Sequence, residues 1–185
     1  MSRKAGTSLS AKTPSAVTVS RGSIDVTVEA DGTEAAPSSF LGHRTAKAAI
    51  AILLAKGQGF HEPTRKERDA LRIGYAMRGK VLYGAAYDMV RMTRTIDLTD
   101  AQTIASSIEA IEIIEVKSTN RVSMKPDLKG YFFNITAGEL LVAQSLGAAF
   151  RFAFVNTLTS EHEELSLNQV LGRARGLYPA WHIRF

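Results

Sequence analysis

Four segments of the chain combine strong helix formers with the residues that begin and end helices. Two of these segments open with a Thr followed three residues later by a Glu, the spacing of a capping box, at Thr64 with Glu67 and at Thr136 with Glu139. A glycine closes the first and the third segment, where a residue of positive φ is favoured. The predicted helices cover residues 40–57, 64–78, 138–147 and 166–174.

Between the helices, apolar and polar residues alternate with the period of two that is typical of a strand. The clearest strands are AIEIIEVKS at 110–118 and FRFAFVNTL at 150–158. Shorter strand-like pieces are KVLY and AAYDMVRMT, on either side of Gly84, and YFFNI at 131–135. The intervening polar segments are interpreted as an insertion with helical character at 94–110 and as loops at 119–130 and 159–165. This order of elements predicts a mixed α/β sheet with helices on its faces.

The N-terminal residues have a different composition. Residues 1–16 are rich in Ser, Thr, Ala, Lys and Pro and have too little apolar surface to order themselves. The alternation in AVTVSRGSIDVTVEADG predicts a β-hairpin at 17–28. We therefore expect a flexible tail over residues 1–38 and one folded domain over residues 39–185.

Composition narrows the class of protein. The chain has 185 residues, 45% of them hydrophobic, which is enough for a core, and no cysteine, which excludes disulfides and cysteine-ligated zinc. The N-terminus has no hydrophobic segment of the signal-peptide kind. The longest apolar run, AAIAILLA at 48–55, is far shorter than the roughly 20 residues of a membrane span. We expect a soluble, cytoplasmic protein without a membrane partner.

Charge is unevenly distributed along the chain, whose net charge is +5. Residues 43–80 hold nine Lys or Arg against three acids, whereas residues 87–118 hold six Asp or Glu against three basic residues. A basic region favours a polyanion, and an acidic patch beside it is what a metal site on a phosphate substrate needs. Two ordinary solvated faces would give the same pattern.

The strand IEIIEVKST, residues 111–119, carries two charges in an apolar run. Alternate residues of a strand share a face, so Glu115 and Lys117 follow Ile111 and Ile113 on one face and mark where that face leaves the core. Burying either charge alone costs on the order of several kcal/mol of desolvation free energy, so each charge needs a partner. Either a weak salt bridge at a strand end or a cation with a phosphate provides one.

Three stretches in order resemble a known family. YDMV, IEIIEVKST and YFFNITAGELLVAQSLGAAFRFAFVNT are similar to the PD-(D/E)XK nuclease superfamily, most of all to its branch called the Protein NO VEIN C-terminal domain, related to Mrr-type restriction nucleases. The resemblance covers about residues 85–158. It implies a restriction-endonuclease-like mixed sheet with an αβββαβ core flanked by helices.

The resemblance also implies catalytic residues. Asp88 matches the first acid, Glu115 the second acid and Lys117 the lysine of the motif. Asp88 precedes Glu115 by 27 positions, more than the branch usually has, so Asp97 is the competing first acid. We prefer Asp88 because its context is apolar and strand-like. Some family members add an acid from the first helix, for which the candidates are Glu62 and Glu67.

The chemistry expected of these residues is metal-dependent hydrolysis. The carboxylates of Asp88 and Glu115, with the backbone carbonyl of Val116, are hard oxygen ligands that suit Mg²⁺ or Mn²⁺. Such an ion lowers the pKa of a bound water, and Lys117 is placed to orient or deprotonate that water or to neutralise charge in the transition state.

Other residues are assigned to DNA binding, to helix capping or to the core. Arg121, Lys125 and Lys129 lie in the loop after the motif, where they either grip a DNA backbone or are simply solvated. Glu139 is interpreted as a helix cap, although the resemblance implies that this helix lies near the site. Four aromatic residues are expected in the core rather than stacked on bases: Tyr75, Tyr83, Phe132 and Phe133.

The sequence thus predicts a Mg²⁺- or Mn²⁺-dependent endonuclease acting on DNA, in restriction or in defence against foreign DNA. A homodimer would serve double-strand cutting. The alternative is a module that keeps the nuclease fold without catalysis and binds nucleic acid or a partner protein. A structural role in a phage or mobile element is a third interpretation.

Overall fold

The computed structural model describes residues 39–177, so the predicted tail over 1–38, with its hairpin at 17–28, and residues 178–185 lie outside the described residues. The helices are α1 (Ser39–Ala55), α2 (Arg65–Met77), α3 (Ala101–Ser106), α4 (Ala137–Leu146) and α5 (Leu167–Arg173). The strands are β1 (Phe60–His61), β2 (Met89–Met92), β3 (Ile111–Thr119), β4 (Phe150–Asn156) and β5 (His162–Leu165). Single 3₁₀ turns occur at Ile108–Ala110, Pro126–Leu128 and Gly147–Ala149. The described part of the chain is a mixed α/β fold.

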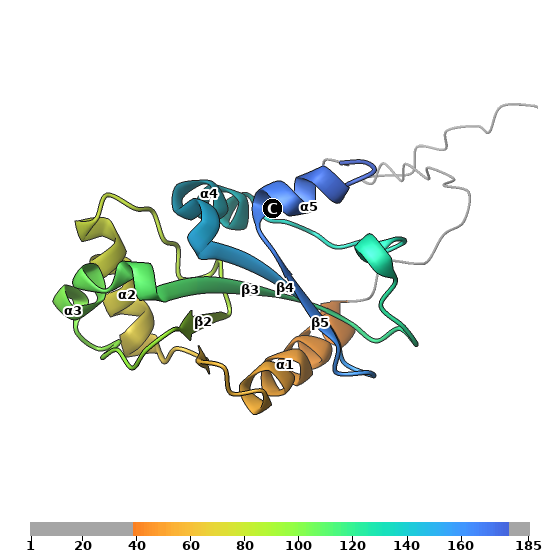
Figure 1. Cartoon of the computed structure of the whole chain (residues 1–185), viewed down its shortest axis with the longest axis horizontal. Helices are drawn as coiled ribbons and strands as arrows, with labels where there is room; N and C mark the ends of the chain where they lie inside the picture. The colour runs from red at the N-terminus through yellow and green to blue at the C-terminus, as the bar shows by residue number, and fades with distance from the viewer. Residues whose placement is uncertain (1–38, 178–185) are drawn as a thin grey trace, which may run out of the picture. The chain divides into compact units, whose positions relative to one another are not determined.

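The five strands form one sheet in the order β1-β2-β3-β4-β5. β3 pairs in parallel with β4, and the other three pairings are antiparallel. The parallel pair is connected through α4, which lies with α5 on one side of the sheet, while α1 lies on the other (Figure 1). Helices therefore cover both faces of the two central strands, as predicted.

Two hydrophobic cores follow from the alternation along β3. Ile111 and Ile113 belong to the larger core, on the side of α4, together with the phenylalanines of β4 and residues of α2 and α5. Ile114 and Val116 belong to the smaller core against α1, with Leu53 of that helix. Glu115 and Lys117 continue the row of Ile111 and Ile113, so their side chains lie on the α4 side.

All four predicted helices are confirmed, and their starts follow from side-chain caps. Thr64 and Thr136 accept a hydrogen bond from the backbone of Glu67 and Glu139, whose carboxylates bond back to the cap residue. Ser166 opens α5 in the same way. The predicted helical insertion at 94–110 contains α3 and the turn after it.

Two strand predictions are wrong, because alternation alone does not provide a pairing partner. Residues 80–83 form no strand: Val81 N–H donates to the Ser145 hydroxyl and Lys80 N–H to the Tyr75 carbonyl. Residues 131–135 also form no strand, although Phe133 packs on the larger core and Phe132 is exposed.

One loop prediction is wrong as well. Residues 162–165 form the edge strand β5 although their sequence is HEEL. The charges are accommodated because Glu163 pairs with Arg173 and Glu164 with Arg91. Charged residues are typical of edge strands, where they discourage pairing with another chain.

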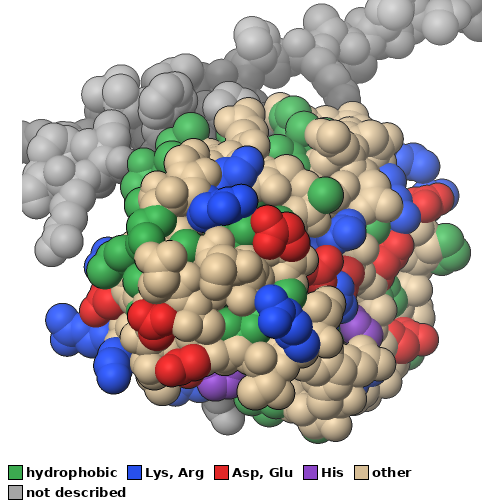
Figure 2. All heavy atoms as spheres, turned by 60° about the vertical axis from the view of Figure 1, so that its left-hand side comes forward, with side chains coloured by type: hydrophobic (Ala, Val, Ile, Leu, Met, Phe, Trp, Pro, Cys, Tyr) green, Lys and Arg blue, Asp and Glu red, His purple; other side chains and the backbone are tan. Residues whose placement is uncertain are grey.

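No helix of residues 39–177 has both the length and the apolar character needed to cross a bilayer. On the face shown in Figure 2, basic and acidic side chains are interspersed rather than separated into two patches. The charge excess of residues 43–80 therefore does not produce a uniformly basic surface on this face.

Candidate active site

The pairing of β2 with β3 brings Asp88 next to Glu115. β2 begins at Met89, opposite Ile114, and the residue before it, Asp88, donates its backbone N–H to the Ile114 carbonyl at 2.9 Å. The Asp88 side chain then accepts a hydrogen bond from Val116 N–H through Oδ2, also at 2.9 Å. The 27-residue separation is absorbed by α3 and its turn, so the acid reaches the centre of β3.

Lys117 connects two carboxylates from different elements. Its Nζ lies 2.9 Å from Glu115 Oε1, on the same strand, and 2.7 Å from Glu139 Oε2, at the start of α4. Glu115 is 8% exposed and Glu139 5%. Asp88, Glu115, Lys117 and Glu139 thus form one largely buried cluster, called the acid–lysine cluster below.

Glu139 has a second role besides capping α4. As predicted, it closes the capping box with Thr136, but the same carboxylate also pairs with Lys117. The third residue of a capped helix points back towards the helix start, and here the helix start lies beside the end of β3. A capping Glu in the helix that follows an E-x-K strand is the signal that would have suggested this contact.

The charges in the cluster perturb one another. Burial raises the pKa of the Glu115 carboxyl to about 8 against the opposing effect of Lys117, and the charges of Asp88 and Glu139 add to the rise. Burial also raises the pKa of Asp88, against the hydrogen bond from Val116 and the charges of Lys117 and Arg68. Burial therefore favours the protonated form of both carboxyl groups.

Lys117 remains a cation in this environment. Burial alone would lower the pKa of its ammonium group, but the ion pairs with Glu115 and Glu139 outweigh burial and hold the pKa above its ordinary value. Because Glu139 is a second counter-ion, protonation of Glu115 still leaves Lys117 paired.

The oxygen atoms at this site are the kind that Mg²⁺ binds. Asp88 and Glu115 supply two carboxylates, and a divalent cation between them would offset the burial that raises the pKa of both by favouring their charged forms. The Val116 carbonyl leaves β3 on the same side as its N–H, which faces Asp88, because both groups of a strand residue point the same way. Within residues 39–177, no group of three or more His, Asp or Glu gathers as a metal site.

The competing acids have other contacts. Asp97 is exposed and accepts hydrogen bonds from the backbone and hydroxyl of Thr99. Glu67 caps α2 and pairs with His61 at 3.1 Å, and Glu62 is exposed. The structure therefore brings together Asp88, Glu115 and Lys117. It connects the competing acids Asp97, Glu62 and Glu67 to none of them.

The predicted nucleic-acid contacts lie in the segment from 120 to 135, called the site loop below. Lys125 and Lys129 are exposed, while the Arg121 guanidinium lies over the Tyr131 ring, 5.1 Å from its centroid. Phe132 is 70% exposed, so its predicted core position is wrong.

Of the other aromatic residues, Tyr83 is likewise exposed. Tyr75 is fully buried, and Phe133 packs edge-to-face on Phe154, as predicted.

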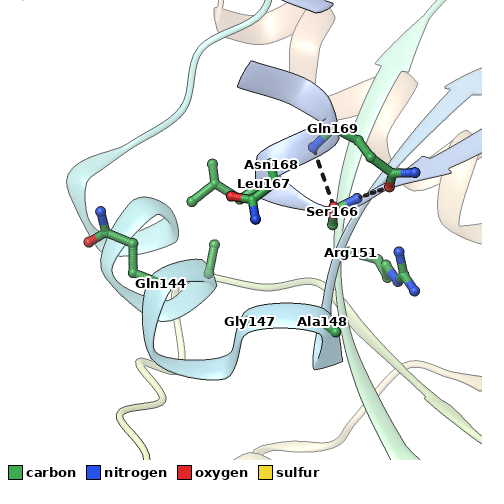
Figure 3. A pocket seen from close by; sticks show the side chains of 9 residues that line it. Gln144, Gly147, Ala148, Arg151, Ser166, Leu167, Asn168 and Gln169 are labelled. Atoms are coloured by element: carbon green, nitrogen blue, oxygen red, sulfur yellow. Dashed lines mark hydrogen bonds between the residues drawn. The ribbon is translucent and has the colours of Figure 1, made fainter. Parts of the chain in front are cut away.

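A pocket of about 490 Å³ lies elsewhere, between α4, the start of β4 and α5 (Figure 3). Its lining includes Gln144, Arg151 and Asn168. Two further polar groups there, Ser166 and Gln169, already bond to each other in the cap of α5. None of the acid–lysine cluster lines this pocket.

The chain matches no family model, no curated protein and no solved structure. A function is therefore inferred from the geometry of the acid–lysine cluster.

Proposed function

We propose that this protein is a metal-dependent nuclease that hydrolyses DNA phosphodiester bonds. The observation that carries the proposal is the meeting of Asp88, Glu115 and Lys117 at one end of the β2–β3 pair, through the Asp88–Val116 and Glu115–Lys117 hydrogen bonds. Two carboxylates and a lysine at this position form the set implied by the resemblance to PD-(D/E)XK nucleases.

Each residue has a role that follows from its surroundings. Asp88 and Glu115, with the Val116 carbonyl, would hold Mg²⁺ or Mn²⁺. When bound, the ion lowers the pKa of a coordinated water and neutralises phosphate charge. Lys117 is held as a cation, which favours orienting the water and stabilising the transition state over removing a proton.

The order of elements supports the proposal. α1, β1, β2 and β3 are followed by α4 and β4, which is the succession of an αβββαβ core with α2 and α3 inserted between strands. β1, β2 and β3 pair consecutively, and β4 adds to β3 in parallel.

The site loop supports a polymeric anion as substrate. It leaves β3 shortly after Lys117 and returns to Thr136, the cap of the helix that carries Glu139, so both of its ends are anchored beside the cluster. Its exposed Lys125, Lys129 and Phe132 offer charge for phosphates and a ring for bases. We infer DNA as the polymer, with restriction or defence as the setting and a homodimer where both strands are cut.

The test is a cleavage assay on supercoiled and linear DNA with Mg²⁺, with Mn²⁺ and with EDTA. The proposal expects cutting only with a metal, and none by Glu115→Ala or Lys117→Ala. Unchanged cutting by both variants would refute the assignment.

A second candidate is a module that binds DNA without cleaving it. The observation that favours it is the internal pairing of the cluster: Lys117 already has two carboxylate partners, and burial favours a protonated Glu115. Retention of DNA in a gel-shift assay, with no metal-dependent cutting, would support this function instead.

A further inference from the structure

Arg68, in the first turn of α2, directs its guanidinium at the backbone of the segment that leads to Asp88. Nη1 donates to the carbonyls of Gly84 and Tyr87, at 3.1 and 2.9 Å, and Nη2 donates to the carbonyl of Asp88 itself, at 2.7 Å. Nε donates to the Pro63 carbonyl at 3.2 Å. One side chain thus ties the start of α2 to three residues of the 84–88 segment.

This segment needs such support because it has no regular structure of its own. Residues 80–88 form neither helix nor strand, and β2 begins only at Met89. The Tyr87 ring is buried beneath the guanidinium, with the Arg68 Cζ 4.7 Å from the ring centroid. Arg68 therefore fixes both the carbonyls and the buried aromatic residue next to Asp88.

Asp88 is held at three points by residues of two elements. Its N–H bonds to Ile114, its Oδ2 accepts from Val116, and its carbonyl accepts from Arg68. The first two contacts are to β3, which follows Asp88 in the sequence. The third comes from α2, which precedes it. Losing the third contact leaves the direction of the Asp88 side chain less constrained.

We propose that Arg68 is a positioning residue that holds Asp88 in place to share a divalent cation with Glu115. The inference rests on the proposed function, since the cation belongs to that site. Lysine cannot replace Arg68 here, because a single ammonium cannot span the Gly84, Tyr87 and Asp88 carbonyls as the planar fork does.

The experiment compares Arg68→Lys and Arg68→Gln with the control Arg72→Gln. Arg72 lies one turn further along α2 and forms an exposed pair with Asp69. The first readout is amide hydrogen exchange followed by NMR at Val116, whose N–H bonds to Asp88, with the amide of Phe152 in β4 as internal reference. The second is the Mn²⁺ dissociation constant from electron paramagnetic resonance, measured beside the cleavage rate as a function of Mn²⁺ concentration.

In Arg68→Lys, the deciding variant, we expect faster exchange at Val116 with Phe152 unchanged, and an affinity for Mn²⁺ about 10- to 100-fold weaker, as for other partners that orient metal ligands. Cleavage should fall at limiting Mn²⁺ and recover at saturation, whereas Arg72→Gln behaves as wild type. Wild-type exchange at Val116, or equal acceleration at Val116 and Phe152, overturns the role of Arg68. A wild-type chain that neither binds Mn²⁺ nor cuts DNA overturns the proposed function, and Val116 exchange then still decides whether Arg68 positions Asp88.

Discussion

Lys117 is the residue through which the cluster is connected. It bonds to a carboxylate on its own strand and to another at the start of α4, so a sheet position and a helix position are joined at one ammonium group. An amine between two buried carboxylates stays protonated, which suits a group that orients and stabilises rather than one that removes a proton.

The contribution of Glu139 to catalysis can be separated from its contribution to the helix. Glu139→Gln keeps a residue that can close a capping box but replaces one of the two carboxyl groups beside Lys117 with a neutral amide. We expect the cleavage rate at saturating Mg²⁺ to fall roughly tenfold or more, with little change in melting temperature.

The matched control is Thr136→Ala, which removes the hydroxyl of the cap and leaves the Lys117 ion pair in place. It should cost about 1 kcal/mol of stability and little activity. Equal losses of activity in both variants would show that the helix start, rather than the charge on Glu139, matters.

Glu115 makes the stability of the metal-free protein depend on pH. Its pKa rises from an ordinary 4.5 to about 8 on folding, so the folded state binds this proton more tightly than the unfolded state. Its favourable contribution is complete below about pH 4.5 and is lost as the pH rises through 8. Denaturant unfolding in EDTA should therefore show a decline in the free energy of unfolding over this range, at a slope of up to about 1.4 kcal/mol per pH unit.

Glu115→Gln removes the titrating group and should flatten that decline. A wild-type decline that persists unchanged in the variant would show that another group is responsible.

At the scale of elements, the helices and the two central strands could be predicted because their signals are local. The capping boxes at Thr64 and Thr136 and the alternation in β3 are complete within a few residues. The face shared by Glu115 and Lys117 followed from the period of two alone. The approach of Asp88 could only be expected from the resemblance, since it depends on how β2 pairs with β3.

The predictions that were wrong or missing concern features that depend on partners distant in the sequence. β5 is a strand because its backbone pairs with β4, and arginines on α5 and β2 neutralise Glu163 and Glu164; the segment HEEL reveals neither. Residues 131–135 alternate correctly, yet no strand edge receives them. The Lys117–Glu139 and Arg68–Asp88 contacts were missed for the same reason, because each joins two elements.

The exposed lysines of the site loop should make the affinity for DNA depend on salt concentration. If Lys125 contacts a phosphate, Lys125→Ala should make the plot of log affinity for DNA against log salt concentration less steep by about 1. The control is Lys66→Ala, which removes an exposed lysine of α2. Fluorescence anisotropy over a salt series measures both, and identical slopes in the two variants would remove the site loop from the interface.

The exposed ring of Phe132 should contribute to DNA binding by stacking on a base, an effect that does not depend on salt. Stacking on a base is worth on the order of 1–3 kcal/mol, so Phe132→Ala should weaken binding of single-stranded DNA about fivefold or more without changing the salt slope. Ile73→Ala, an exposed apolar residue of α2, is the control in the same anisotropy experiment. Equal affinity of both variants and the wild type would assign Phe132 no contact with bases.

At the scale of the whole molecule, the sheet sets the distance between residues that the sequence keeps apart. α3 and its turn fold outside the β2–β3 pair, and α4 returns the chain to β3 before β4 joins it in parallel. The acid–lysine cluster forms because of this connectivity, and Arg68 of α2 bonds to the carbonyl of Asp88. The net charge of +5 adds a general attraction for nucleic acid but no position for it.

The proposed function depends on the shared binding of one metal ion by Asp88 and Glu115. Its most direct test is Mn²⁺ binding and plasmid cleavage by Asp88→Asn and Asp97→Asn, two variants with the same chemical change at the two rival positions. We expect Asp88→Asn to lose both activities and Asp97→Asn, whose carboxylate accepts hydrogen bonds from Thr99, to keep both. Loss in Asp97→Asn with retention in Asp88→Asn would contradict it.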